Sequence, residues 1–267
     1  MPTSARSSAS VTPREVSPEI LERRERVFLI MAGIFLCAMT MLNIIGITRF
    51  IQLGPMALAV GVLPYPLTFL CTDLISELYG RKRANFLVTV GLFLNFFILG
   101  TMWLGQAMPA AAAQPPWQLI QLAEGVALPN GTVVEGQVEM FSLMYATTSG
   151  AVFASMMAYI AAQYCDVYMF HFWKRLTDGK HLWLRNNGST LISQGVDSLM
   201  VISVTFGATF ISGGITLAGM LVLMGSNYLF KMMCALADTP FFYLGVHYLK
   251  GYLDLTDEEI HAHAISD

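Results

Sequence analysis

The sequence is poor in charge. Lysine, arginine, aspartate and glutamate make up 12% of its 267 residues, against roughly 25% in an ordinary soluble domain. Hydrophobic residues make up 55%, which excludes a chain that meets only water. The net charge of -3 says little about partners, and we expect no nucleic-acid partner. The composition predicts a membrane protein, with the lipid bilayer as its first partner.

Paired cysteines are also lacking. The four cysteines lie inside apolar runs and form no CxxC pattern: Cys37, Cys71, Cys165 and Cys234. We interpret them as small buried hydrophobic residues, so the sequence predicts no disulfide, no metal site and no cofactor.

Long apolar runs are present, and each is close to the roughly 20 residues that cross a bilayer as a helix. Six such spans are predicted: Val27–Gly46, Met56–Leu78, Ala84–Met108, Glu139–Cys165, Asn187–Ile211 and Thr216–Tyr248. The expected fold is an all-α membrane protein, a six-transmembrane-helix bundle at residues 26–250. Residues 1–25, without a cleaved signal, are expected to be a disordered cytoplasmic tail, and 251–267 a short cytoplasmic C-terminal tail.

The basic residues predict the direction of the spans. Thirteen of the fifteen lie in the N-terminal tail, in alternate loops or after the last span. Loops rich in Lys and Arg stay on the cytoplasmic side, which puts both termini in the cytoplasm. The two exceptions are Arg49 in another loop and Lys231 inside the last span.

Small residues recur every fourth position in the fourth span, at Gly150, Ala154, Ala158 and Ala162. This spacing lets two helix backbones approach closely. Two uses are consistent with it: packing inside one chain, or the face of a homodimer.

The second span ends in PYPLTFLCTDLISELYGRKRA, residues 64–84. A charged side chain inside a bilayer costs about 2.5–3.5 kcal/mol on insertion scales, so Asp73 needs a partner or a function. Glu77 is closer to the end of the span and could pair with Arg81 four residues on. The prolines break the helix above Asp73, and such a break is tolerated where it lines a cavity or is covered by protein.

The last two spans carry further polar residues. Gln194 and Asp197 share one face of the fifth span with Ser193. In the sixth span a polar stripe holds Asn227, Lys231 and Asp238. Lys231 could pair with either aspartate and simply hold the bundle together, because buried ion pairs are often only structural. Amide and hydroxyl groups on the same faces favour a polar cavity for a ligand instead.

Three runs together resemble the queuosine precursor transporter family, which is similar to vitamin uptake transporters: PYPLTFLCTDLISELYGRKRA, STLISQGVDSLMV (189–201) and YLFKMMCALADTPFFYL (228–244). The resemblance covers about residues 27–250. It implies a six-helix carrier in the bacterial inner membrane, similar in architecture to vitamin-binding S components. Its implied cargo is a 7-deazaguanine, preQ0 or preQ1, used to make queuosine in tRNA.

On this resemblance we expect a binding site for a flat heterocycle rather than a catalytic centre. Asp197 or Asp73 would accept from the guanine edge, and Glu77 would assist or lock the end of its span. The expected polar partners are Gln194, Asn227 and Lys231, and the expected stacking surfaces are Tyr65, Phe69 and Phe230.

Two alternatives come from other classes. Asp73 and Asp197 on facing helices could form an intramembrane aspartyl protease dyad, although neither has a glycine-rich context. An S component would bind a vitamin but need an energy-coupling ATPase. Such proteins commonly carry an AxxxA patch on the first span, and Ala32, Gly33 and Ala38 do not make one.

Overall fold

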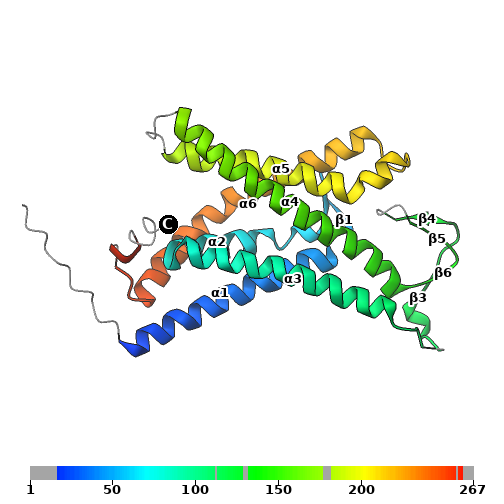
Figure 1. The fold of residues 1–267 in the computed structure, drawn as a ribbon, viewed down its shortest axis with the longest axis horizontal. Helices are drawn as coiled ribbons and strands as arrows, with labels where there is room; N and C mark the ends of the chain where they lie inside the picture. The colour runs from blue at the N-terminus through cyan, green and yellow to red at the C-terminus, as the bar shows by residue number, and fades with distance from the viewer. Residues whose placement is uncertain (1–16, 112, 129–131, 177–181, 257, 261–267) are drawn as a thin grey trace, which may run out of the picture.

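The structure is a computed structural model that describes residues 17–111, 113–128, 132–176, 182–256 and 258–260. It is mainly helical (Figure 1). The helices are α1 (Pro18–Ile45), α2 (Tyr65–Tyr79), α3 (Arg81–Ala107), α4 (Met140–Leu176), α5 (Leu182–Ile211) and α6 (Leu217–Tyr252). Short antiparallel pairs join some of them: β1 (Phe50–Leu53) with β2 (Met56–Ala59), β3 (Leu119–Gln121) with β6 (Gln137–Glu139), and β4 (Val126–Ala127) with β5 (Val133–Val134).

Helices α1, α2, α3 and α6 pack together, and α4 and α5 lie side by side along their flank (Figure 1). The start of α1 and the end of α6 meet, because Arg23 and Arg24 donate hydrogen bonds to the carbonyl oxygens of Tyr252 and Leu253. Arg83 at the start of α3 forms an ion pair with Glu25 there. We call this the basic end, and the opposite end, where β1 and β2 pair, the hairpin end.

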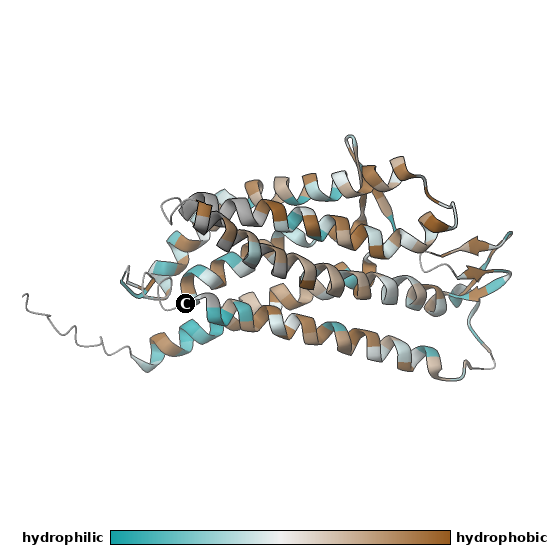
Figure 2. Cartoon of the chain, turned by 45° about the horizontal axis from the view of Figure 1, so that its top comes forward, coloured by the Kyte–Doolittle hydropathy of each residue, from teal (hydrophilic) through white to brown (hydrophobic). Residues whose placement is uncertain are grey.

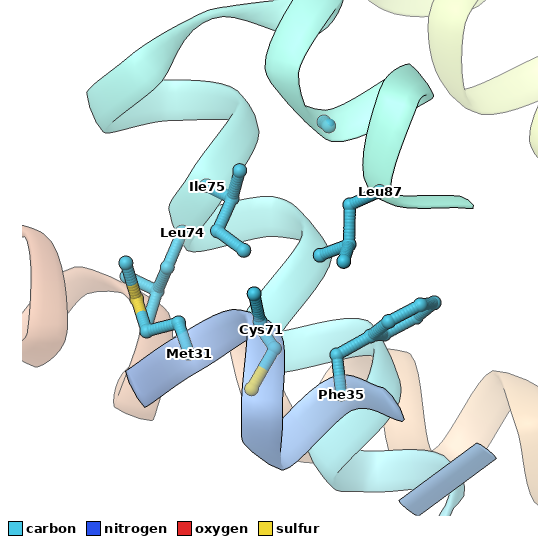
Figure 3. Packing of buried hydrophobic residues seen from close by; sticks show 8 residues of the cluster. Met31, Phe35, Cys71, Leu74, Ile75 and Leu87 are labelled. Atoms are coloured by element: carbon cyan, nitrogen blue, oxygen red, sulfur yellow. The ribbon is translucent and has the colours of Figure 1, made fainter. Parts of the chain in front are cut away.

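The largest buried cluster joins α1, α2 and α3 near the basic end. Met31 and Phe35 of α1 contact Cys71 and Ile75 of α2, and Leu87 reaches them from α3 (Figure 3). Apolar side chains of α6 cover its edge. Burial of this kind stabilises by roughly 25 cal/mol per Å² of apolar surface, and here it fixes α2 between α1 and α6.

The outer surface carries many large apolar side chains. Phe86, Phe93 and Phe97 on one side of α3 are about two-thirds exposed, a surface that suits lipid and not water. Hydrophilic residues gather toward the ends of the helices (Figure 2). Among the described residues, five helices are long and apolar enough to cross a membrane: α1, α3, α4, α5 and α6.

The second predicted span differs from the prediction. Met56–Ala59 forms strand β2, a 3-10 turn covers Val60–Val62, and α2 begins only at Tyr65. Proline has no backbone N–H and clashes with the preceding turn, so Pro64 and Pro66 keep the helix from extending backward. With 15 residues, α2 is about 22 Å long and shorter than the hydrocarbon core of a bilayer.

The β1–β2 hairpin fills the space beyond α2. Leu58 is almost fully buried, and the Ala57 N–H donates to the Ser226 hydroxyl of α6 over 3.3 Å. Gly61 approaches the end of α1 so closely that a Cβ there would lie 2.7 Å from the Leu42 carbonyl oxygen. Its N–H donates to the carbonyl of Gly46 over 2.9 Å. Irregular backbone is tolerated at membrane depth where protein covers it, and α1 and α6 provide that cover.

Parts of both expected tails belong to the folded chain. Helix α1 begins at Pro18, inside the expected tail, because the Ser17 side chain caps it by accepting from the Ile20 N–H. After α6, Leu253 and Leu255 are buried against Leu78, so the chain there packs under the bundle. Residues 1–16 and 261–267, the other parts of the two expected tails, lie outside the described residues.

The stripe of small residues in α4 is used inside the chain. Ala154, Ala158 and Ala162 are 0%, 1% and 9% exposed, and α4 packs mainly against α5. Gly150 lies at a half-buried position of the same helix. These small residues therefore pack against other helices of the same chain, which is the first of the two uses predicted for them.

Candidate functional site

A central cavity of about 220 Å³ lies among five helices. Its wall includes polar groups on three of them: Thr68 and Thr72 on α2, Ser155 and Tyr159 on α4, and Gln194 and Asp197 on α5. Apolar side chains of α1 and α3 complete the wall, among them Phe35, Met39 and Val88. A smaller cavity of about 70 Å³ adjoins it toward the hairpin end, with Leu42, Tyr65 and Ser155 common to both.

An ion pair closes one side of the central cavity. The Lys231 ammonium donates a hydrogen bond to Oδ2 of Asp197. Lys231 is 0% exposed, whereas the Asp197 side chain is 18% exposed and lines the cavity. The ammonium lies behind the carboxylate, where it holds the negative charge in place without entering the cavity itself.

The ring of Tyr65 gives the ammonium a second partner. Nζ of Lys231 is 4.9 Å from the centre of this ring, within the range in which a cation is attracted to an aromatic face. Loss of hydration is the main cost of burying an ammonium, and one carboxylate and one ring offset it together. Lys231 thereby connects three helices, α2, α5 and α6.

Aromatic rings form the side of the cavity that α2 contributes. Tyr65 and Phe69 are one turn apart, with ring centres 5.6 Å apart and planes tilted by 37°. Both line the cavity. Phe230 is placed elsewhere: it is buried with Met56, Leu58 and Val62 and supports the hairpin.

The amides predicted for the site lie at different levels. Gln194 is one turn before Asp197 on α5 and lines the central cavity. Asn227 is one turn before Lys231 on α6, is 6% exposed and lines the smaller cavity. Together they place hydrogen-bonding groups on both sides of the ion pair along the bundle.

Asp73 and Glu77 do not line either cavity. Both are exposed at the surface of the single chain. The carboxyl of Asp73 is close enough to that of Asp238 on α6 for their charges to interact. Asp197 pairs with Lys231 and not with Asp73, so these two aspartates do not form the dyad that an intramembrane aspartyl protease would need.

Several polar residues of the cavity were not predicted. Thr68 and Thr72 on α2, and Ser155 and Tyr159 on α4, are pairs four residues apart. This spacing on otherwise apolar helices was the signal that could have found them. Asn43 and Asn95 also escaped the prediction: the Asn43 amide donates to Oδ1 of Asn95 over 2.9 Å and ties α1 to α3 beside the smaller cavity.

The fold and the cavity define a class: a multi-pass membrane protein with a cavity that polar and apolar side chains of five helices line. Residues 59–245 match the family described as "Putative vitamin uptake transporter", and the chain belongs to this family. It is similar to a protein of Bacillus subtilis (strain 168) named "Probable queuosine precursor transporter", with 26% identity over 203 residues that cover 74% of this chain and 75% of that protein. No solved structure matches the chain significantly. The chain is thus a transporter-family protein of the bacterial inner membrane.

Proposed function

We propose that the protein imports a queuosine precursor, preQ0 or preQ1, through the central cavity. The observation that carries the proposal is the Asp197 carboxylate, which lines the cavity while Lys231, whose ammonium lies over the Tyr65 ring, pairs with it from behind. A deazaguanine presents adjacent N–H donors on its guanine edge, and one carboxylate can accept both of them. The name of the Bacillus subtilis relative supports the same class of substrate.

The remaining groups suit a flat two-ring ligand. Tyr65 and Phe69 provide aromatic faces, against which a heterocycle can stack. Gln194 offers an amide that can donate to the carbonyl oxygen of the base, and Asn227 lies toward the hairpin end, where the C7 substituent could extend. The cavity of about 220 Å³ is below the usual range of roughly 300–1,000 Å³ for drug-sized ligands, so it suits a small heterocycle better than a larger ligand.

We propose different roles for the three other predicted residues. Phe230 supports the hairpin that covers the hairpin end of the cavity. Asp73 and Glu77 lie on α2 beyond the cavity wall, so they are not assigned to the guanine edge.

We further propose that the chain crosses the membrane six times, with the basic end in the cytoplasm. Arg23, Arg24, Lys82, Arg83 and Lys250 lie at or near this end, as the positive-inside rule requires. The second crossing would be made by α2 together with the hairpin. Because the side chains that line the cavity all come from one chain and the small-residue stripe is largely buried, we infer that the monomer is the transporting unit. Cysteines placed at Ala154 and Ala158 should therefore give no crosslink between copies.

Thermal unfolding of the purified protein tests the ligand. We expect preQ0 or preQ1 to raise the unfolding midpoint while guanine has a smaller effect and biotin none. At a hundredfold excess over the dissociation constant, binding stabilises by about 2.7 kcal/mol. Asp197→Asn should lower affinity about 100-fold, since it loses charge-assisted hydrogen bonds, and Glu258→Gln, on an exposed position beyond α6, should not. Stabilisation by biotin alone would reject the deazaguanine.

An S component that needs an ATPase is the second candidate, favoured by the vitamin-uptake description of the family. Uptake into proteoliposomes that contain only this chain distinguishes the two. Transport without ATP or a partner supports the self-sufficient carrier, whereas binding without transport supports the S component.

A further inference from the structure

A second polar feature of α6 lies outside the cavity. Asp238 is 8% exposed, and its Oδ2 is buried with no hydrogen-bond partner among the described residues. It follows Lys231 by two helical turns toward the basic end. The adjacent Thr239 hydroxyl donates to the carbonyl of Ala235 in its own helix. A buried carboxylate without a partner is costly in an apolar environment, so this side chain calls for a ligand.

Helix α2 packs against α6 along the stretch that includes Asp73. The two helices run in the same direction, and Phe69 of α2 packs against the cluster that contains Cys234 of α6. Asp73 and Asp238 each come one turn later. Leu74 then packs against Gly245, where a Cβ would lie 3.0 Å from its side chain. These contacts keep α2 and α6 packed on both sides of Asp73, and its carboxyl is close enough to that of Asp238 for their charges to interact.

Few other charged groups surround this pair. The titratable side chains on the same two helices near the pair are Cys71 and Glu77 on α2 and Lys231 and Cys234 on α6. Helix α5 contributes Asp197. Helices α1 and α3 contribute apolar side chains, such as Met31, Phe35 and Leu87. Lys231 is already paired with Asp197. The described neighbourhood thus offers no cation that pairs with Asp238, and few of the oxygen ligands that a metal cation needs.

We propose that Asp73 and Asp238 form the proton-binding site that couples transport to the proton gradient. Two carboxylates held together in an apolar environment share a proton more readily than they both ionise. Asp238 supplies the buried oxygen that has no hydrogen-bond partner among the described residues. The Asp73 side chain is exposed, so a proton can reach the pair from outside the packed interior.

The position of the pair explains how protonation acts on the cavity. Thr72 and Phe69, next to Asp73 and one turn before it, line the cavity. With one proton bound, α2 and α6 can stay packed at this level. When the proton leaves toward the cytoplasm, repulsion between the two carboxylates separates the helices beneath the cavity and favours release of the substrate at the basic end.

The inference rests on the proposed function and is tested in proteoliposomes that hold the full chain. Uptake of labelled preQ0 or preQ1 is measured with and without an inward proton gradient, and exchange is measured at equal pH. An inward gradient of one pH unit supports about tenfold accumulation for one proton per substrate. We expect Asp238→Asn to bind substrate and exchange it like the parent protein but to lose accumulation. Asp73→Asn should lose it as well, and Glu258→Gln should keep it.

Different results would reject the proton site and the proposed transport function. Two results would overturn the proton site alone. In the first, the parent protein binds substrate but its uptake does not depend on the proton gradient. In the second, both aspartate variants still accumulate substrate. Accumulation driven by a sodium gradient would assign the pair to another cation and also overturn it. If the parent protein neither binds nor transports a deazaguanine, both proposals fall. The unfolding midpoint of each variant shows that it is folded before transport is compared.

Discussion

Lys231 and Asp197 are joined by a hydrogen-bonded ion pair in which only the carboxylate reaches the cavity. The pair joins α6 to α5, and the Tyr65 ring of α2 covers the ammonium. The two residues therefore have separate roles, because Lys231 fixes the charge and Asp197 presents it to the ligand. Substitutions can separate stability from binding on this basis.

The first prediction concerns the ion pair. Lys231→Met should destabilise the protein by about 3–5 kcal/mol, since it leaves one buried charge unpaired. The double variant Lys231→Met, Asp197→Asn removes both charges, so it should regain most of this stability but still fail to bind preQ0 or preQ1. Unfolding midpoints and ligand-induced shifts measure the two effects. If binding returns together with stability in the double variant, the pair is structural and not part of the site.

How far the sequence predicted this site depends on the kind of residue. Buried charge in an apolar chain is costly wherever it occurs, so Asp197, Lys231 and their neighbour Gln194 could be identified by composition and spacing alone. The side of each helix that meets another helix is set by tertiary packing. For this reason the sequence could not predict that Lys231 stays behind Asp197, or that Phe230 supports the hairpin.

The fold was likewise predicted in part from the sequence. Five long helices were predicted near their observed positions, because an apolar run of about 20 residues has few other structures available in lipid. The β1–β2 hairpin was missed, since its apolar residues read as the start of a span. Only the backbone contact between Gly61 and Gly46 shows why the chain turns there.

The second prediction tests that contact. Gly61→Ala would place a Cβ 2.7 Å from the Leu42 carbonyl oxygen and 2.8 Å from Cα of Gly46. Both are backbone atoms, so a helix or the hairpin must shift, at a cost of about 1–3 kcal/mol. Thermal unfolding should show a clear loss of stability. Gly33→Ala is the control in α1, where nothing lies within 4 Å, and it should be neutral or slightly stabilising.

The third prediction concerns pH. Burial raises the pKa of Glu259, but hydrogen bonds from Thr256 and Arg24 more than offset it and hold the pKa below its ordinary value. A carboxyl whose pKa is lower in the folded state stabilises the fold above its unfolded pKa, about 4.3. That stability is lost as the pH falls through the folded pKa.

The matching experiment compares unfolding midpoints from pH 7 downward. The parent protein should be more stable than Glu259→Gln near neutral pH, and the difference should shrink in the acidic range. Glu258→Gln removes the exposed neighbouring carboxyl and should follow the parent protein throughout. A constant difference between the parent and Glu259→Gln would contradict the role of the ion pair with Arg24.

The last prediction separates the two uses of the Tyr65 ring. Tyr65→Phe keeps an aromatic face beneath the Lys231 ammonium and toward the cavity, so ligand affinity should change by less than about threefold. Tyr65→Leu loses the cation–π contact and the stacking surface together, and affinity should fall by about tenfold or more, because each is worth about 1 kcal/mol or somewhat more. Phe69→Leu removes stacking but not the contact with the ammonium, since Lys231 lies over Tyr65. If Phe69→Leu lowers the ligand affinity but not the stability, the heterocycle stacks on the α2 rings. If all three variants bind the ligand equally well, the heterocycle does not lie against Tyr65 or Phe69.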